Sequence, residues 1–387
     1  MFMRSFKVML LILILMLVTC CRSAAMPATV PATTATMTST PIPSTATPTL
    51  TPTSTWVDDF TAFMESDEGF SGAALVAYKE EILWEAAFEM ADQSQNIPNQ
   101  TDTLFNLGSM NKMFTAVAIM QLVEQGKLSL ENRIGDVLPN YPNTTVAETV
   151  TIHHLLTHTS GLGDVFTEEF AANPHQYRTN ADFLSLFVDE PLLFQPGEEF
   201  SYSNAGFVVL GQVIEQVSGQ SYYDYIQQNI FDPSGMVNTD SFEVDANVSG
   251  LAVGYTTRDF FGNDTGILTS NTALLPGRGF AAGGGYSTVE DLLHFRNALL
   301  GFELLSPEST GLLLAGKARM GEYTLYAYGF MDRLVAGERV VGHTGGCPGV
   351  CSFLYMYPET GYTIIVLSNI DDGCIPALRY LGDHPLE

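Results

Sequence analysis

Positive charge is scarce in this 387-residue sequence. It has 16 lysines and arginines against 43 aspartates and glutamates, a formal net charge of −27, and only five of the basic residues are lysines. Nucleic acids and anionic lipid surfaces attract clustered positive charge. A strongly acidic chain therefore excludes both as partners of the folded part and favours solubility outside a cell. The charge balance says little about a small-molecule or peptide substrate.

Cysteine is also scarce, with five residues, two of which, Cys20 and Cys21, lie near the N-terminus. The remaining three form no C-x-x-C pair, and no histidines stand beside them at metal-ligand spacing, so we expect no metal site. In an exported protein, one disulfide and one free thiol are compatible with three cysteines. We favour the pair Cys347–Cys374 over pairs with Cys351, because an expected hairpin would bring those two positions near each other.

The N-terminus predicts export. Arg4 and Lys7 precede an apolar run from Val8 to Val18, which is too short to span a bilayer as a stable helix. The following Leu-Val-Thr-Cys resembles a bacterial lipobox, in which Cys20 would be lipidated and would provide the only membrane contact. Ordinary cleavage near Ala24 is the alternative. We therefore assign residues 1–23 to an export signal with a candidate lipid anchor.

Residues 24–55 consist mostly of threonine, proline, alanine and serine. Such a composition offers too little apolar surface to offset chain entropy, so we expect a disordered linker there. Residues 56–387 are long enough for a single large domain. Oligomeric state is not predicted by any pattern in the chain.

Within that domain, strand patterns lie at the two ends and helix patterns in the middle. Alternating apolar runs predict a hairpin over 72–92 and a second group of strands over 328–367. Helical patterns lie within 105–127, around 153–158, at 205–218 and 222–230, and in the second part of 280–300. This layout predicts an α/β (α+β) fold: an antiparallel β-sheet built from both ends and flanked by helices, with an all-helical region inserted. The tail after Asn369 is short, which leaves one sheet face uncovered unless residues 57–67 pack there.

The longest helical pattern after the N-terminal signal, residues 105–127, carries the first reactive pair. Ser109 and Lys112 are three residues apart, so both face the same side of a helix that is apolar nearly all round. Burial lowers the pKa of a lysine, and a neutral amine can take a proton from a serine hydroxyl. The structural alternative is a serine N-cap followed by a lysine whose ammonium extends to the solvent.

Two later segments add polar groups at the ends of regular elements. Tyr202 and Asn204 lie in a polar loop just before a helix, where a tyrosine hydroxyl could contact the serine. His343 follows an expected strand and is followed by Thr344 and two glycines, which permit close approach of backbone N–H groups to a substrate carbonyl.

In this order and context, Ser-x-x-Lys, Tyr-x-Asn and His-Thr-Gly resemble the serine β-lactamase and penicillin-binding-protein superfamily. The closest resemblance is to its class C-like branch of esterases, D-aminopeptidases and D-alanyl-D-alanine carboxypeptidases. It extends from about Phe60 to Asn369, and two further segments support it: Leu155–Leu162 (LLTHTSGL) and Gln195–Glu198 (QPGE).

The resemblance implies a β-lactamase/transpeptidase-like fold and a covalent acyl-enzyme, with no metal or cofactor. Ser109 would be the nucleophile, Lys112 its activating partner, and Tyr202 a second group in proton transfer. Asn204 would bind the substrate amide. His343 and Thr344 would line the opposite wall. The backbone N–H groups of Ser109 and Gly346 would form the oxyanion hole, and Gly345 belongs to the same substrate-binding segment.

His343 departs from the lysine that β-lactamases have at this position. Histidine is mostly neutral above a pKa of about 6.5, so recognition of a substrate carboxylate should be weaker. We therefore expect an exported serine hydrolase acting on an ester or amide, including a D-amino acid peptide. The alternatives are a catalytically idle binding or sensing lipoprotein and a true β-lactamase.

Overall fold

The computed structural model describes residues 54–67 and 69–386. The expected export signal, the lipidation candidate Cys20 and the linker up to residue 53 lie outside these residues. Within them, no helix combines the length and apolar character needed to cross a membrane.

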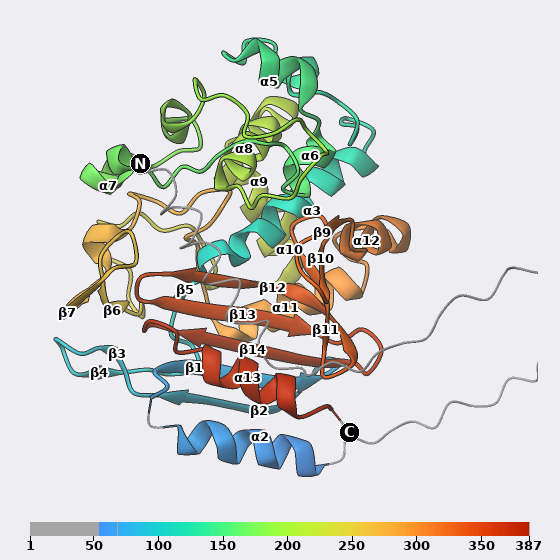
Figure 1. The fold of residues 1–387 in the computed structure, drawn as a ribbon. Helices are drawn as coiled ribbons and strands as arrows, with labels where there is room; N and C mark the ends of the chain where they lie inside the picture. Colours follow the sequence, from blue (N-terminus) through green and yellow to red (C-terminus); the bar gives the residue numbers. More distant parts are fainter. Residues whose placement is uncertain (1–53, 68, 387) are drawn as a thin grey trace, which may run out of the picture. The chain divides into compact units, whose positions relative to one another are not determined.

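The core of the fold is an eight-stranded antiparallel sheet (Figure 1) with the strand order β2-β1-β14-β13-β12-β11-β10-β9. N-terminal β1 pairs directly with C-terminal β14, from Gly72 opposite Ser368 to Tyr78 opposite Tyr362, which confirms the expected assembly of the sheet from both ends. The strands are β1 (Gly72–Tyr78), β2 (Glu81–Phe88), β9 (Ala318–Arg319), β10 (Thr324–Tyr326), β11 (Met331–Val335), β12 (Glu338–Cys347), β13 (Val350–Met356) and β14 (Tyr362–Ser368).

Two helices from opposite ends of the chain cover one face of this sheet. Helix α2 (Ser54–Ser66) and helix α13 (Ile375–Asp383) lie next to each other against the strands in Figure 1. Trp56 and Phe60 stack on one turn of α2, and Phe60 also contacts Tyr380 of α13 with ring centroids 5.5 Å apart. Helix α13 thus covers only part of this sheet face, and α2 covers the rest, as the sequence suggested for residues 57–67.

The opposite face of the sheet packs against the helical region. Helix α3 (Asn111–Glu124) is buried from Asn111 to Leu122, as its uniformly apolar sequence predicts, and it packs against α8 (Asn204–Ser218). Helix α11 (Val289–Leu300) begins at the N-cap Thr288 and contacts β1 and β14. The other helices of four or more residues among the described residues are α4 (Ile134–Val137), α5 (Thr144–Thr149), α6 (Ile152–Leu156), α7 (Glu168–Ala172), the 3-10 helix η3 (Asp182–Leu186), α9 (Tyr222–Ile226), continued by a π-helical turn (Gln227–Phe231), and α12 (Pro307–Leu314).

The expected disulfide Cys347–Cys374 is wrong: Cys374 bonds Cys351, and Cys347 is free. Strand geometry explains the error. Cys347 pairs with Val350 across the β12–β13 hairpin, so the side chain of the next residue, Cys351, points to the other face of the sheet. That face is the one covered by α13, at whose start Cys374 lies.

The disulfide fastens α13 to the sheet and closes a loop with a sequence separation of 23 residues. We expect Cys374→Ser to lower the free energy of unfolding by about 3 kcal/mol, the value that loop-closure entropy gives for a loop of this length. Urea unfolding under non-reducing conditions measures the loss. Cys347→Ser is the control and should change stability little. Equal effects of the two substitutions would contradict the assigned pairing.

Candidate active site

Ser109 lies in a tight turn between a short strand and the most buried helix. The turn is the 3-10 helix η1 (Gly108–Met110), which follows β5 (Phe105–Asn106) and leads directly into α3. Gly108 has φ +52°, and a Cβ on it would lie 2.7 Å from the backbone nitrogen of Gly346, so only glycine fits there. Ser109 keeps partial exposure and does not cap the helix, so the N-cap alternative is excluded.

Lys112 is completely buried, which also excludes the solvent-exposed alternative for its ammonium group. Its Nζ donates to Asn204 Oδ1 at 2.7 Å and to the carbonyl oxygen of Ala282 at 2.6 Å, and it lies 3.2 Å from Ser109 Oγ. The first two partners can only accept hydrogen bonds. A neutral amine has two N–H bonds, which these acceptors occupy, so its lone pair is directed at Ser109.

Burial lowers the pKa of Lys112 to about 7, and the negative charge of Asp164 opposes the shift. A substantial fraction of the amine is therefore neutral near neutral pH. The group is then able to accept the serine proton, and the ammonium that forms has three acceptors in place. Geometry and pKa together fit a general base.

The Asn204 side chain is held between Lys112 and Asp164. Its Nδ2 donates to both carboxylate oxygens of Asp164 at 3.1 Å, which fixes the opposite end of the amide, Oδ1, towards Lys112. Because a carboxylate only accepts, this assignment of the amide atoms is forced. Asp164 is not among the residues that the sequence motifs predict.

Tyr202 places its ring over the lysine and its hydroxyl near the serine. Lys112 Nζ lies 4.8 Å from the ring centroid, and the buried hydroxyl has no hydrogen-bond partner of regular geometry. Burial raises the pKa of Tyr202, and the Ser109 side chain counteracts this rise. The hydroxyl is therefore a neutral donor close to the serine.

His158, in the Leu155–Leu162 segment, holds the Tyr202 loop from behind. Its carbonyl oxygen accepts from the Ser201 N–H at 2.9 Å, and its Nδ1 accepts from the Ser203 N–H at 3.2 Å. The imidazole also packs on the Tyr202 ring with centroids 4.1 Å apart. Its pKa is well below the ordinary value because of burial and the neighbouring Lys112. His158 is thus a neutral support of the loop.

His343 is fully buried in the structure, behind the surface of the opposite wall. Its Nδ1 lies 2.5 Å from the carbonyl oxygen of Thr344, which can only accept, so this nitrogen carries the proton and Nε2 accepts from the Tyr326 hydroxyl at 2.9 Å. Burial and Lys112 lower the pKa of His343 to about 3. The residue is neutral, as the sequence analysis expected.

The strand end brings its backbone against the serine turn. A Cβ on Gly345 would lie 1.9 Å from the carbonyl oxygen of Leu107, so β12 approaches η1 only because glycine stands there. Pairing with β11 stops at Gly342, and beyond this point no described strand pairs with that edge of β12. Thr344 is partly exposed, and as the strand neighbour of His343 its side chain points to the opposite face.

Comparison with known proteins is consistent with this geometry. The Beta-lactamase family model matches residues 56–377. The chain belongs to the β-lactamase family. It is 32% identical to penicillin-binding protein 4* of Bacillus subtilis over 317 aligned residues. This alignment covers 78% of this chain and 69% of that protein.

Two solved structures resemble the fold of this β-lactamase family member. The penicillin-binding protein of Bacillus halodurans has a TM-score of 0.76 and 35% identity, covering 84% of this chain and 99% of that one. The D-amino acid amidase of Ochrobactrum anthropi SV3 has a TM-score of 0.70 and 24% identity over 84% of this chain and 96% of that one, a likeness of fold. The expected class of enzyme, a serine hydrolase, is confirmed by this membership.

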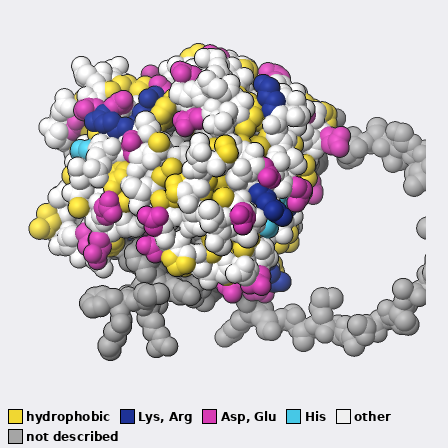
Figure 2. All heavy atoms as spheres, turned by 90° about the horizontal axis from the view of Figure 1, so that it is seen from above, with side chains coloured by type: hydrophobic (Ala, Val, Ile, Leu, Met, Phe, Trp, Pro, Cys, Tyr) yellow, Lys and Arg dark blue, Asp and Glu magenta, His cyan; other side chains and the backbone are white. Residues whose placement is uncertain are grey.

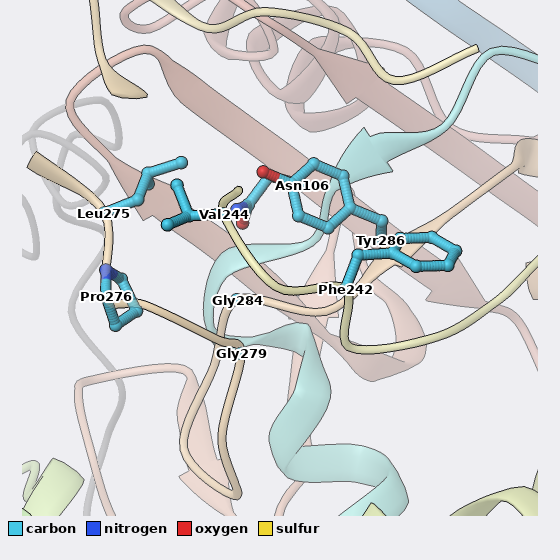
Figure 3. A pocket seen from close by; sticks show the side chains of 8 residues that line it. All are labelled: Asn106, Phe242, Val244, Leu275, Pro276, Gly279, Gly284 and Tyr286. Atoms are coloured by element: carbon cyan, nitrogen blue, oxygen red, sulfur yellow. The ribbon is translucent and has the colours of Figure 1, made fainter. Parts of the chain in front are cut away.

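A small hollow lies beside the serine turn, where Asn106 and Gly284 both hydrogen-bond the backbone of Gly108. Figure 3 shows this hollow, which is lined by Asn106, Phe242, Val244, Leu275, Pro276, Gly279, Gly284 and Tyr286, none of them a predicted site residue.

Within the described ranges, no group of three or more acidic, histidine or cysteine residues is arranged to hold a metal ion. Acidic side chains outnumber Lys and Arg on the face shown in Figure 2.

Sequence reasoning missed three contributors to the site: the Asp164 carboxylate, the Ala282 carbonyl and the Tyr326 hydroxyl. Asp164 could have been found from the sequence, because it lies two residues after the Leu155–Leu162 segment that supports the family resemblance. Backbone carbonyls leave no residue-type signal, so Ala282 could not have been found from its side chain. Tyr326 lies in β10, a short strand that the sequence patterns did not predict.

Removal of the Tyr202 hydroxyl separates chemistry from stability. Because this oxygen has no regular hydrogen-bond partner, we expect Tyr202→Phe to change the free energy of unfolding by less than about 1 kcal/mol. Ester turnover should fall roughly 100-fold if the hydroxyl transfers a proton. The rate of hydrolysis of an aryl ester measures the turnover, and urea unfolding of the same variant measures the stability. Tyr222→Phe, which removes a buried hydroxyl bonded to Thr115, is the control and should destabilise without a specific loss of turnover.

Proposed function

We propose that this protein is an exported hydrolase that cleaves an ester or amide through an acyl-enzyme on Ser109. The observation that carries the proposal is the hydrogen bonding of Lys112. Two obligate acceptors occupy two of its N–H bonds, and the remaining direction points at Ser109 Oγ, 3.2 Å away. A buried lysine with no chemical role would be a costly feature of this core.

In the acylation step, Ser109 Oγ attacks the substrate carbonyl carbon while its proton passes to Lys112. Negative charge develops on the carbonyl oxygen, where the backbone N–H groups of Ser109 and Gly346 would stabilise it. The Tyr202 hydroxyl then gives its proton to the leaving group and takes in its place the proton held by Lys112, and the carbonyl–leaving-group bond breaks. Water attacks the resulting ester by the same route in reverse and frees Ser109.

The charge of the site favours an acyl donor that does not depend on a carboxylate contact. His343 is neutral and buried, so the fixed cation that would face a carboxylate is missing from this wall. This disfavours true β-lactamase activity and favours esters or D-amino acid amides. The name of the Ochrobactrum relative, a D-amino acid amidase, supports an amide substrate, and the names of the Bacillus relatives support recognition of penicillin-like acyl groups.

Export and lipidation of Cys20 are part of the proposal. The charged start, the short apolar run and the cysteine after it support them. The linker would then give the domain reach from the membrane or wall.

A covalent serine probe separates a hydrolase from an idle binding protein. We expect intact-mass spectrometry after exposure to a fluorophosphonate to show a single adduct on the wild type and none on Ser109→Ala. Ser201→Ala is the matched control: this serine precedes Tyr202 in the same loop, and its removal should leave the adduct unchanged.

The outcomes of this experiment are distinct. An adduct lost only with Ser109 establishes an activated serine at this position. An adduct that survives in Ser109→Ala, or the absence of any adduct on the wild type, would contradict the proposal and favour the binding or sensing role.

A further inference from the structure

Asp164 lies at the end of a continuous hydrogen-bonded series that starts at the nucleophile. Ser109 contacts Lys112, Lys112 donates to Asn204 Oδ1, and Asn204 Nδ2 donates to Asp164. Both carboxylate oxygens lie 3.1 Å from Asn204 Nδ2, so the carboxylate holds the end of the amide that is opposite Oδ1.

The position of the carboxylate is itself fixed by the local backbone. Asp164 Oδ1 also accepts from the N–H groups of Val165 at 2.7 Å and Phe166 at 3.3 Å. The residue forms no ion pair with any described lysine, arginine or histidine within 4.0 Å. Burial raises the pKa of Asp164, whereas the hydrogen bonds from Asn204, Phe166 and Val165 and the nearby Lys112 favour its charged form.

We propose that Asp164 is a positioning residue for the reaction: its carboxylate keeps Asn204 Oδ1 turned towards Lys112, and its negative charge stabilises the ammonium that forms when Ser109 gives up its proton. The role corresponds to that of the carboxylate which orients and stabilises the base in a serine–histidine–aspartate triad. In this step the proton moves from Ser109 Oγ to Lys112 Nζ, and neither Asn204 nor Asp164 gains or loses a proton. This inference rests on the proposed function.

The other titratable groups around Lys112 do not supply this charge. Tyr202 faces it from the loop before α8, His158 from the loop after α6, and His343 from β12. Burial lowers the pKa of both histidines and raises that of the tyrosine, so all three are neutral near pH 7. Asp164 is the acidic group that raises the pKa of Lys112, against the effect of burial.

The chain contains a close structural match that serves as a control. Asp259 accepts from two backbone N–H groups, of Phe261 and Asn263, and from the Asn263 side-chain amide through both carboxylate oxygens. Asp164 has the same set of partners, but only its amide partner also contacts Lys112. Asp164→Asn and Asp259→Asn therefore each remove one carboxylate with the same pattern of hydrogen bonds, although burial raises the pKa of Asp164 and hydrogen bonds keep that of Asp259 low.

The test is the rate of fluorophosphonate labelling of Ser109 between pH 5 and pH 10. In the wild type, the rate should rise with pH around a midpoint near 7, where Lys112 loses its proton. Loss of the negative charge destabilises the ammonium and lowers the pKa of Lys112. Asp164→Asn should thus move the midpoint to lower pH by about half a unit or more. Its plateau rate should fall roughly tenfold as Asn204 loses its fixed orientation.

Asp259→Asn should retain the wild-type profile. Asp164→Glu keeps the charge but displaces it, so we expect an unchanged midpoint with a lower plateau, and this variant also serves if Asp164→Asn does not fold. An unchanged midpoint in folded Asp164→Asn, or a wild-type plateau in Asp164→Glu, would overturn the inference. If the wild type is not labelled, the proposed function fails and the inference fails with it. If the wild type is labelled but the Asp164 variants keep its midpoint and its plateau rate, the proposed function stands and the inference alone fails.

Discussion

The cost of burying the Lys112 amine governs the organisation of this site. An isolated ammonium inside a protein is strongly unfavourable, so its acceptors must be supplied by the fold or the group must give up its proton. Here the acceptors come from three separate parts of the chain: the turn before α3, the start of α8 and the glycine-rich segment that holds Ala282. The lysine is satisfied only when all three have assembled, and its pKa then lies near neutrality.

Close backbone packing around the serine turn is the second requirement. A Cβ on Gly108 or Gly345 would collide with the backbone of the facing segment. Gly283 packs against the same turn, because a Cβ on it would lie 3.0 Å from the carbonyl oxygen of Gly108. These contacts bring the edge of β12 and the glycine-rich loop within reach of Ser109. Larger residues at these positions would push the edge of β12 and the glycine-rich loop away from Ser109, although the reactive side chains themselves would be unchanged.

Much of this arrangement could be predicted because it depends on local sequence. The apolar helix pattern located Ser109 and Lys112 on one face, and period-two patterns at both ends of the chain located the sheet. What failed depended on facts outside any single segment. The choice between Cys347 and Cys351 as the partner of Cys374 could not be made without the register of the β12–β13 hairpin, which places Cys351 on the other face. The burial of His343 depends on Tyr326, a residue of a strand too short to give a pattern.

The most direct test of the account is the protonation of Lys112 itself. With only five lysines in the chain, nitrogen-15 labelling of lysine gives a spectrum simple enough to follow each side-chain nitrogen through a pH titration. Lys317 is expected to titrate near 8 because it is partly buried, and its signal is identified by its loss in Lys317→Met. The account predicts a second signal, absent from Lys112→Met, with a midpoint near 7. A midpoint near 10 for that signal would show that Lys112 remains charged and cannot be the base.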